Sequence, residues 1–565
     1  MADLTRRGLL GGMTVGMLAG GASRAAPNVA PVTPAAGDNP RNDPYRAAGE
    51  WPIVVTESGK VRGYIHNGII TFKGIPYGAD TGGVRRFLPP QKPAPWEGVR
   101  SSLFYGPVSP QPAREGWKHD EEAWMFNWND GIQSEDCLRL NIWTPGADAR
   151  VKRPVLVWIH GGAFSNGCAQ EQPGYDGENL SRSGDVVIVS LNHRLGSVGF
   201  LNLSRFGDSY GGSGNVGMLD IVLALEWVRD NIAAFGGDPH CVTIFGQSGG
   251  GSKVSTLLAM PSATALFHRA IVQSGAALQI GTRETSQRFT DEVLKELGSH
   301  GTSLDRLQAV SFSELAASGA RATARLRAPG ASEAMGRSPP PGDFRPFVDG
   351  NVIAQHPFDP DAPRISASVP LMVGTVLNEH IHALNHPEYE SMSEESARAA
   401  LVRAYGAQGG AIYDAIHGRE PHLKPFDVWS QGAAGSARAR ALKQASLKAA
   451  QGRAPAYVYW FQWQTPVLDG RPRAFHCAEI AFAFDNAVVA GTMTGGGERA
   501  VRLARKVSQA WVHFARNGNP NHAELAKWPP YSDRQPATMV FDDVCRVEMA
   551  PDRKEQSLIS SALDI

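Results

Sequence analysis

The 565-residue chain carries 55 Lys plus Arg, 55 Asp plus Glu and 42% hydrophobic residues. Its zero net charge argues against nucleic acid as a partner, and no apolar run reaches the roughly 18 residues of a membrane-spanning helix. This length and composition predict either two to four domains or one large α/β domain with insertions, with no integral membrane segment in the mature chain.

The first 26 residues have the pattern of a twin-arginine export signal. The letters TRRGLL at 5–10 lead into a short apolar, Gly-rich run, and small residues near 23–26 suit cleavage. The alternative is a frayed N-terminus with two chance arginines. Residues 27–50 are rich in Pro and Ala and predict a linker. We therefore expect residues 51–565 to form the mature domain, exported folded to the periplasm or the medium.

Apolar strands alternate with helical patterns along the rest of the chain. Such an order predicts an α/β fold in which a mostly parallel sheet is covered by helices on both faces. Helical segments at about 276–345 and 385–450 are expected to be insertions that cap the site. The five cysteines are scattered without a CxxC pair, so neither a zinc site nor a disulfide framework is indicated. The predicted elements are strands at 154–162 and 185–194, a helix at 218–235, a strand at 241–246 running into a helix, and strands at 269–275, 369–375 and 456–463.

The glycine-rich letters GQSGGG at 246–251 stand between a predicted strand and a predicted helix. The segment lacks the Lys and Ser/Thr order of a phosphate-binding P-loop and the spacing of a dinucleotide fingerprint. It matches G-x-S-x-G, in which a serine occupies a strained turn at the sheet edge and the flanking glycines leave room for it. Ser248 is therefore the candidate nucleophile.

A serine hydroxyl needs a base, and the base needs an acid that orients it. In this fold class the chain order is serine, acid, histidine. Glu379 follows the predicted strand 369–375, and His476 lies in a loop near the end of the sheet, so they are the candidate acid and base. The alternatives are a solvated glutamate and a structural histidine.

Backbone donors for an oxyanion are predicted in the letters WIHGGAF at 158–164, which follow an early strand. The N–H groups of Gly162 and Ala163, together with that of Gly249, could point at one oxygen. The alternative is an ordinary turn after a strand.

Ten motifs in order make the chain resemble the type-B carboxylesterases, a family that includes bacterial nitrobenzyl esterases and cholinesterases. The resemblance covers about residues 51–550 and implies an α/β-hydrolase fold, hydrolysis of small-molecule carboxylic esters and no metal or cofactor. It supports the same six site residues and assigns no substrate-binding residue. The motifs are FKGIPYG, RRFLPP, SEDCLRLNIWTP, WIHGGAF, VSLNHRLGSVGFL, GNVGMLDIVLALEWVRDNIAAFGGDP, VTIFGQSGGG, FHRAIVQSG, FHCAEIAFAF and WPPYS.

The resemblance also implies structural features outside the catalytic groups. It suggests two scaffold ion pairs, Arg86 with Glu135 and Arg194 with Asp220. In many relatives a cysteine at the position of Cys137 forms a disulfide with one some thirty residues earlier. Ser109 stands at that earlier position, so we expect Cys137 to be unpaired.

Three departures from the family pattern concern the site itself. Gln247 replaces the usual Glu before the nucleophile, Gly249 replaces Ala after it, and Ala163 replaces the third glycine of the oxyanion loop. Loss of the negative charge at position 247 argues against a choline-like cationic substrate.

Other functions remain open at this point. An amidase or carbamate hydrolase would use the same residues, and a non-catalytic binding or adhesion relative would not need them. A metal site formed by His380, His382 and His386 is a further alternative. Aromatic residues of the strand at 456–463, such as Trp460, are expected to pack in the core.

Overall fold

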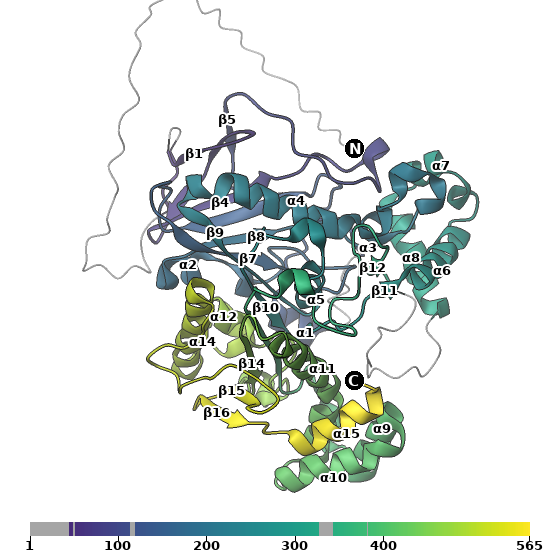
Figure 1. Cartoon of the computed structure of the whole chain (residues 1–565), viewed down its shortest axis with the longest axis vertical. Coiled ribbons are helices and arrows are strands. Elements are labelled where there is room, and N and C mark those ends of the chain that lie inside the picture. Colours follow the sequence, from purple (N-terminus) through teal and green to yellow (C-terminus); the bar gives the residue numbers. More distant parts are fainter. Residues whose placement is uncertain (1–44, 49–50, 113–118, 327–342, 381) are drawn as a thin grey trace, which may run out of the picture. The chain divides into compact units, whose positions relative to one another are not determined.

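The computed structural model describes residues 45–48, 51–112, 119–326, 343–380 and 382–565 (Figure 1). The predicted signal at 1–26, nearly all of the predicted linker and most of the Pro-rich loop at 337–347 lie outside these residues. Within the linker, Arg46 pairs with Ile65 as an isolated bridge, so these residues contact the domain.

A mixed sheet forms the centre of the described residues and has eleven strands there. From β8 to β15 neighbouring strands are parallel, and strands at both edges are antiparallel. In order across the sheet the strands are β16 (Arg546–Met549), β15 (Ala537–Phe541), β14 (Ala456–Phe461), β13 (Leu371–Val376), β10 (Arg269–Gln273), β9 (Gly237–Gln247), β7 (Arg153–Ile159), β8 (Val187–Leu191), β6 (Arg139–Thr144), β4 (Ile69–Pro76) and β3 (Tyr64–His66).

Two smaller sheets accompany it in the described residues. One consists of β1 (Ile53–Thr56), β2 (Gly59–Arg62) and β5 (Val99–Ser101), and the other of β11 (Gly281–Thr282) and β12 (Phe347–Val348).

Helices cover both faces of the main sheet, as predicted, and the side chains of β7 show why. Val155, Val157 and Ile159 pack in one core cluster together with residues of α4 and α5. Leu156 and Trp158 pack in another with residues of α2 and α14. Successive strand residues point to opposite faces, so a continuous apolar run requires cover on both.

The helices that carry this cover and the insertions are distributed along the whole described chain (Figure 1). None of them combines the length and apolar composition needed to span a bilayer. They are α1 (Asp120–Phe126), α2 (Glu178–Gly184), α3 (Gly196–Phe200), α4 (Val216–Asn231), α5 (Gly249–Leu257), α6 (Arg283–Glu296), α7 (Leu304–Ala309), α8 (Phe312–Leu326), α9 (Glu394–Tyr405), α10 (Gly409–Arg419), α11 (Pro425–Ala450), α12 (Ile480–Ala483), α13 (Gly491–Thr494), α14 (Glu498–Asn517) and α15 (Arg553–Leu563).

The predicted insertion at 276–345 contains α6, α7 and α8, whereas the one at 385–450 is only partly an insertion. Helices α9 and α10 pack on α11 and α15, but α11 itself packs on β13 and β14. Its inward face carries Ala441 and Ala445, which join the core beside Val373. These small residues let α11 lie close to the sheet. Because alanine contributes little to an apolar pattern, the sequence does not show that α11 belongs to the core.

Candidate active site

Ser248 occupies a sharp turn between β9 and α5. Its backbone has φ 58° and ψ −124°, a strained conformation for a residue with a side chain. The Ser248 N–H donates to the carbonyl of Gln273 on the neighbouring strand at 2.8 Å. Although Ser248 precedes the first turn of α5, its hydroxyl does not cap the helix. The predicted elbow is therefore confirmed, with a half-buried serine whose hydroxyl is not used for helix capping.

The flanking glycines are required by space. A Cβ on Gly246 would lie 2.6 Å from the carbonyl oxygen of Ile159, and one on Gly250 would lie 2.1 Å from the same oxygen. Strands β7 and β9 are neighbours, with Ile159 paired to Gly246. The turn can therefore approach the end of β7 only with glycine at both positions.

Glu379 lies just after β13 and is 3% exposed. One of its oxygens, Oε1, accepts the Val376 N–H at 3.3 Å. Its backbone carbonyl accepts the N–H of His476 at 2.7 Å, which joins the loop after β13 to the loop after β14. This backbone contact fixes the separation of the two side chains.

His476 directs its Nδ1 at the other oxygen of Glu379, Oε2, at 2.5 Å. Nδ1 therefore carries the proton in this pair, and Nε2 offers a lone pair. Burial lowers the pKa of His476 below its ordinary value and raises the pKa of Glu379. Burial alone thus favours the neutral imidazole, the form that accepts a proton.

Gln247 also contacts this imidazole, a contact that the sequence did not predict. Its amide nitrogen lies 3.2 Å from His476 Nε2 and 3.4 Å from Nδ1, while its amide oxygen accepts the Cys477 thiol at 3.1 Å. Since Nδ1 donates to Glu379, Nε2 is the available acceptor. Gln247 is the last residue of β9 and precedes Ser248, so this contact brings the serine turn and the histidine loop together.

The segment 160–164 after β7 approaches the start of α5. A Cβ on Gly249 would lie 2.2 Å from the carbonyl oxygen of Ala163, so the two backbones are in contact. Gly162 (φ 75°) and Ala163 (φ 51°) both have left-handed backbones. Among the described residues, the N–H groups of Gly162, Ala163 and Gly249 have no hydrogen-bond acceptor. Three unpaired donors thus occur on two touching segments.

His380, His382 and His386, the candidates for a metal site, do not converge on one point in the described residues. His380 is exposed, and its ring lies 3.7 Å from that of His476, centroid to centroid. His386 contacts Glu388 and the ring of Tyr389. Across the described residues no group of three or more His, Cys, Asp or Glu side chains is arranged to hold a metal ion. The ring contact places His380 beside the base.

The scaffold ion pairs implied by the resemblance are confirmed. Arg86 contacts Glu135 at 2.6 Å, and the fully buried Arg194 contacts Asp220 at 2.6 Å. The buried Arg194 pair is completed by hydrogen bonds, as a buried pair requires.

Cys137 forms no disulfide bond, as predicted, and is fully buried. The hydroxyl of Ser109 instead accepts the N–H of Leu195 at 3.0 Å.

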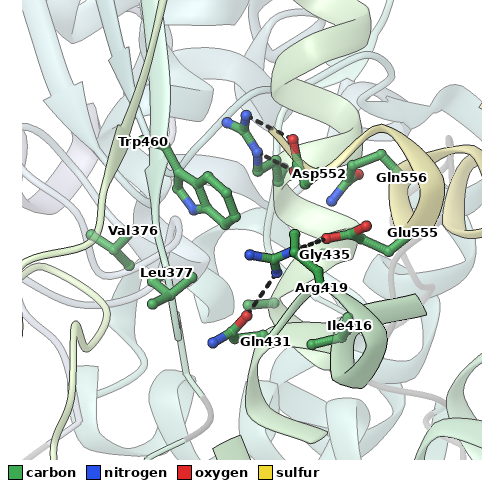
Figure 2. A pocket seen from close by; sticks show the side chains of 12 residues that line it. Val376, Leu377, Ile416, Arg419, Gln431, Gly435, Trp460, Asp552, Glu555 and Gln556 are labelled. Carbon is green, nitrogen blue, oxygen red and sulfur yellow. Dashed lines mark hydrogen bonds and ion pairs between the residues drawn. The ribbon is translucent and has the colours of Figure 1, made fainter. Parts of the chain in front are cut away.

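A small cavity lies between the ends of β13 and β14 and residues of α10, α11 and α15 (Figure 2). Its volume of about 10 Å³ is that of roughly one water molecule. Paired charges line it, with Arg438–Asp552 at 2.5 Å and Arg419–Glu555 at 2.7 Å. Trp460 is 4% exposed there, which confirms its prediction as a packing residue. We interpret this cavity as part of the scaffold.

Comparison with known proteins identifies the family. The Carboxylesterase family profile matches residues 50–408 and 436–558. The para-nitrobenzyl esterase of Bacillus subtilis (strain 168) is 34% identical over 517 residues, covering 90% of this chain and 99% of that protein. The phenmedipham hydrolase of Pseudarthrobacter oxydans is 32% identical, covering 87% and 95%.

Solved structures agree. A Clostridium hathewayi esterase, described as able to hydrolyse aliphatic aromatic polyesters, superposes with a TM-score of 0.77 at 36% identity, covering 92% of this chain and 99% of that one. A Geobacillus stearothermophilus carboxylesterase gives 0.73 at 35% identity, covering 90% and 99%. The chain belongs to the carboxylesterase family, has the α/β-hydrolase fold and is a carboxylic-ester hydrolase.

Proposed function

We propose that Ser248, His476 and Glu379 are the nucleophile, base and acid of this ester hydrolase. The observation that carries the proposal is the 2.5 Å contact between Glu379 and Nδ1 of His476, on an imidazole that also contacts Gln247, the residue before the strained Ser248. In that arrangement Nε2 accepts the serine proton in place of the Gln247 amide N–H that it contacts here, and the serine hydroxyl is not used by helix α5.

The N–H groups of Gly162, Ala163 and Gly249 are the proposed oxyanion donors. Their lack of acceptors in the described residues and the contact between Ala163 and Gly249 support this role. An oxygen that becomes negative between these segments would also benefit from the N-terminal end of α5. Each such donor is worth about 3–4 kcal/mol in the barrier.

The reaction then proceeds in two halves. Nε2 of His476 accepts the Ser248 proton as the oxygen attacks the ester carbonyl, and Glu379 stabilises the imidazolium that forms. The tetrahedral oxyanion collapses, the C–O bond to the alcohol breaks, and His476 gives its proton to the leaving alkoxide. Water, deprotonated by His476, then attacks the acyl-enzyme and releases the carboxylic acid and Ser248.

We further propose that uncharged esters of aromatic alcohols, such as para-nitrobenzyl esters, are substrates. His380 is an exposed residue whose ring lies against that of His476, so it is the candidate for a planar contact with such a leaving group, and Gln247 supplies no negative charge for a cation. The test is a comparison of kcat/KM for para-nitrobenzyl, short alkyl and choline acetates with matched amides and carbamates. We expect the para-nitrobenzyl ester to have the highest kcat/KM. A higher kcat/KM for the amide or the carbamate would overturn this specificity.

Gln247→Glu is expected to move the acidic limb of the pH–rate profile upward. A carboxylate about 3 Å from the imidazole favours its charged form, which should raise the pKa of His476 by about 1–3 units. Since only the neutral imidazole accepts the serine proton, activity at low pH should fall while activity on the plateau changes less. The measurement is kcat/KM against pH for wild type, Gln247→Glu and the uncharged control Gln247→Met. An acidic limb at the same pH in all three proteins would contradict the inference that the side chain at position 247 acts on the pKa of His476.

Export through the twin-arginine route is proposed from the letters TRRGLL at 5–10. Replacing both arginines by lysine should retain the full-length chain in the cytoplasm, detected by fractionation and immunoblotting. Unchanged export of that variant would refute the proposal.

A further inference from the structure

Lys253 is a fully buried lysine in α5, one turn beyond Ser248. Its ammonium forms no ion pair within the described residues. Instead Nζ donates to the carbonyl of His160 at 3.0 Å and to that of Gly161 at 3.4 Å, and it lies 5.5 Å from the ring centroid of Phe164. All three partners belong to the segment 160–164 that follows β7. A charge buried without an ion-pair partner is costly. We therefore ask what the contacts of this ammonium with the segment 160–164 contribute.

The carbonyl of Gly161 and the N–H of Gly162 belong to one planar, conjugated peptide group. A cation on the oxygen withdraws electron density from the group and makes its N–H a stronger donor, because hydrogen bonds in a chain polarise one another. The N–H of Gly162 is a proposed oxyanion donor. A charge on Nζ is thus connected to the oxyanion through the bonded O, C and N atoms of this peptide group as well as through space.

The second contact fixes the same segment in position. The carbonyl of His160 lies one peptide earlier, so Nζ holds two successive carbonyls while the N–H groups of the following residues stay unpaired. Preorganised donors lower the barrier because they need not reorient when the charge develops. The left-handed backbone of Ala163 costs energy, because its side chain disfavours that conformation, and it benefits from such support.

We propose that Lys253 is a positioning residue for ester hydrolysis: its ammonium holds the segment 160–164 and polarises the Gly161–Gly162 peptide toward the oxyanion. This proposal rests on the oxyanion donors assigned above.

The charge at Lys253 is expected to depend on pH. Burial lowers the pKa of Lys253 to about 7, while Glu171 acts in the opposite direction. Nδ1 of His160 lies 3.0 Å from the same Gly161 carbonyl, and the ring of His193, whose pKa burial holds well below its ordinary value, stacks on the ring of His160. Because a lysine loses its charge as the pH rises through its pKa, the contribution to catalysis should be present below about pH 7 and lost above it. The alkaline limb of kcat would therefore report Lys253.

Lys448 provides a matched control. It is also a buried lysine, 2% exposed, and Nζ donates to two successive carbonyls, Ser366 at 2.8 Å and Ala367 at 2.9 Å. Burial lowers its pKa to about 8. Its carbonyl partners lie before β13 and outside the segment 160–164, so Lys448→Met removes the same kind of interaction without touching the proposed donors.

The experiment compares kcat, KM and pH profiles of Lys253→Met, Lys253→Arg and Lys448→Met with wild type. For Lys253→Met we expect kcat at pH 6.5 to fall about 10- to 100-fold, less than the loss of a whole donor, with KM changed less than about threefold. The alkaline limb should vanish in Lys253→Met and move beyond the measured range in Lys253→Arg. Affinity for an aryl trifluoromethyl ketone should fall in parallel with kcat, and Lys448→Met should retain wild-type kinetics.

Each result decides the proposal. A wild-type kcat and pH profile in Lys253→Met would overturn it, as would an equal loss of kcat in Lys448→Met. Thermal unfolding separates a structural role, because a lower midpoint with unchanged ketone affinity per folded molecule would also refute the proposal. Ser248→Ala, assayed alongside, tests the assigned nucleophile separately from the role of Lys253. Activity remaining in Ser248→Ala would refute the nucleophile independently of the results for the Lys253 variants.

Discussion

Ser248→Ala is expected to lower kcat by about a millionfold, because without the serine no acyl-enzyme forms and the base has no proton to accept. The fold should be unaffected. Ser248 precedes α5, where a serine often caps the helix and its loss costs about 1 kcal/mol, but here the hydroxyl makes no capping bond. The free energy of unfolding, measured by urea titration, should therefore equal that of wild type.

Ser252→Ala is the matched control one turn further along the same helix. The Ser252 hydroxyl donates to the carbonyl of Gly275 at 3.1 Å, so its removal should cost about 1 kcal/mol of stability. Its activity should stay within a few fold of wild type. A fluorophosphonate probe should label wild type and Ser252→Ala but not Ser248→Ala. Labelling of Ser248→Ala, or appreciable turnover by it, would show that another residue is the nucleophile.

The main elements of this fold and the serine turn could be predicted because they depend on local sequence. The apolar run of β7 requires cover on both faces, and G-x-S-x-G between a strand and a helix defines the elbow at Ser248. The position of Glu379 and His476 after core strands also predicts them as the acid and the base. In the structure their side chains are in contact, and a hydrogen bond between the backbones of their two loops holds them together.

The contacts of Gln247 and Lys253 could not be predicted in this way. Gln247 reaches His476 across about 230 residues of sequence, and nothing in its neighbours indicates that pairing. Lys253 stands in a run of glycine and serine, where a lysine is normally a solvated side chain. In the folded chain the segment 160–164 lies against α5 and contacts its ammonium. The sequence predicts α11 as part of an insertion, although it packs on β13 and β14. Alanine contributes little to an apolar pattern but allows close packing on a sheet.

Two buried glutamates near the site have opposite expected roles. Glu379 contacts Nδ1 of His476 at 2.5 Å, so it must be ionised to accept that proton and to balance the imidazolium. Burial raises the pKa of Glu379 to about 7, and burial together with the charge of Glu379 raises the pKa of the fully buried Glu479 further, to about 8. A group with that pKa is mostly neutral at pH 7, where it resembles an amide. Its oxygen accepts the Gln273 amide at 3.3 Å, an interaction that a glutamine could retain.

Glu379→Gln is therefore expected to lower kcat by about 10⁴-fold at pH 7, whereas Glu479→Gln should stay within about threefold. An amide at position 379 can present its NH₂ to Nδ1, which stabilises the tautomer with the proton on Nε2 and leaves no lone pair for the serine. Steady-state kinetics between pH 5 and 9 measure both variants, and the Glu379→Gln rate should rise with pH as hydroxide replaces the missing base. Equal losses in the two variants would indicate that general damage to a buried polar cluster, rather than a specific carboxylate, accounts for the effect. A Glu379→Asp variant should recover part of the lost rate, because it restores the charge at a greater distance from Nδ1.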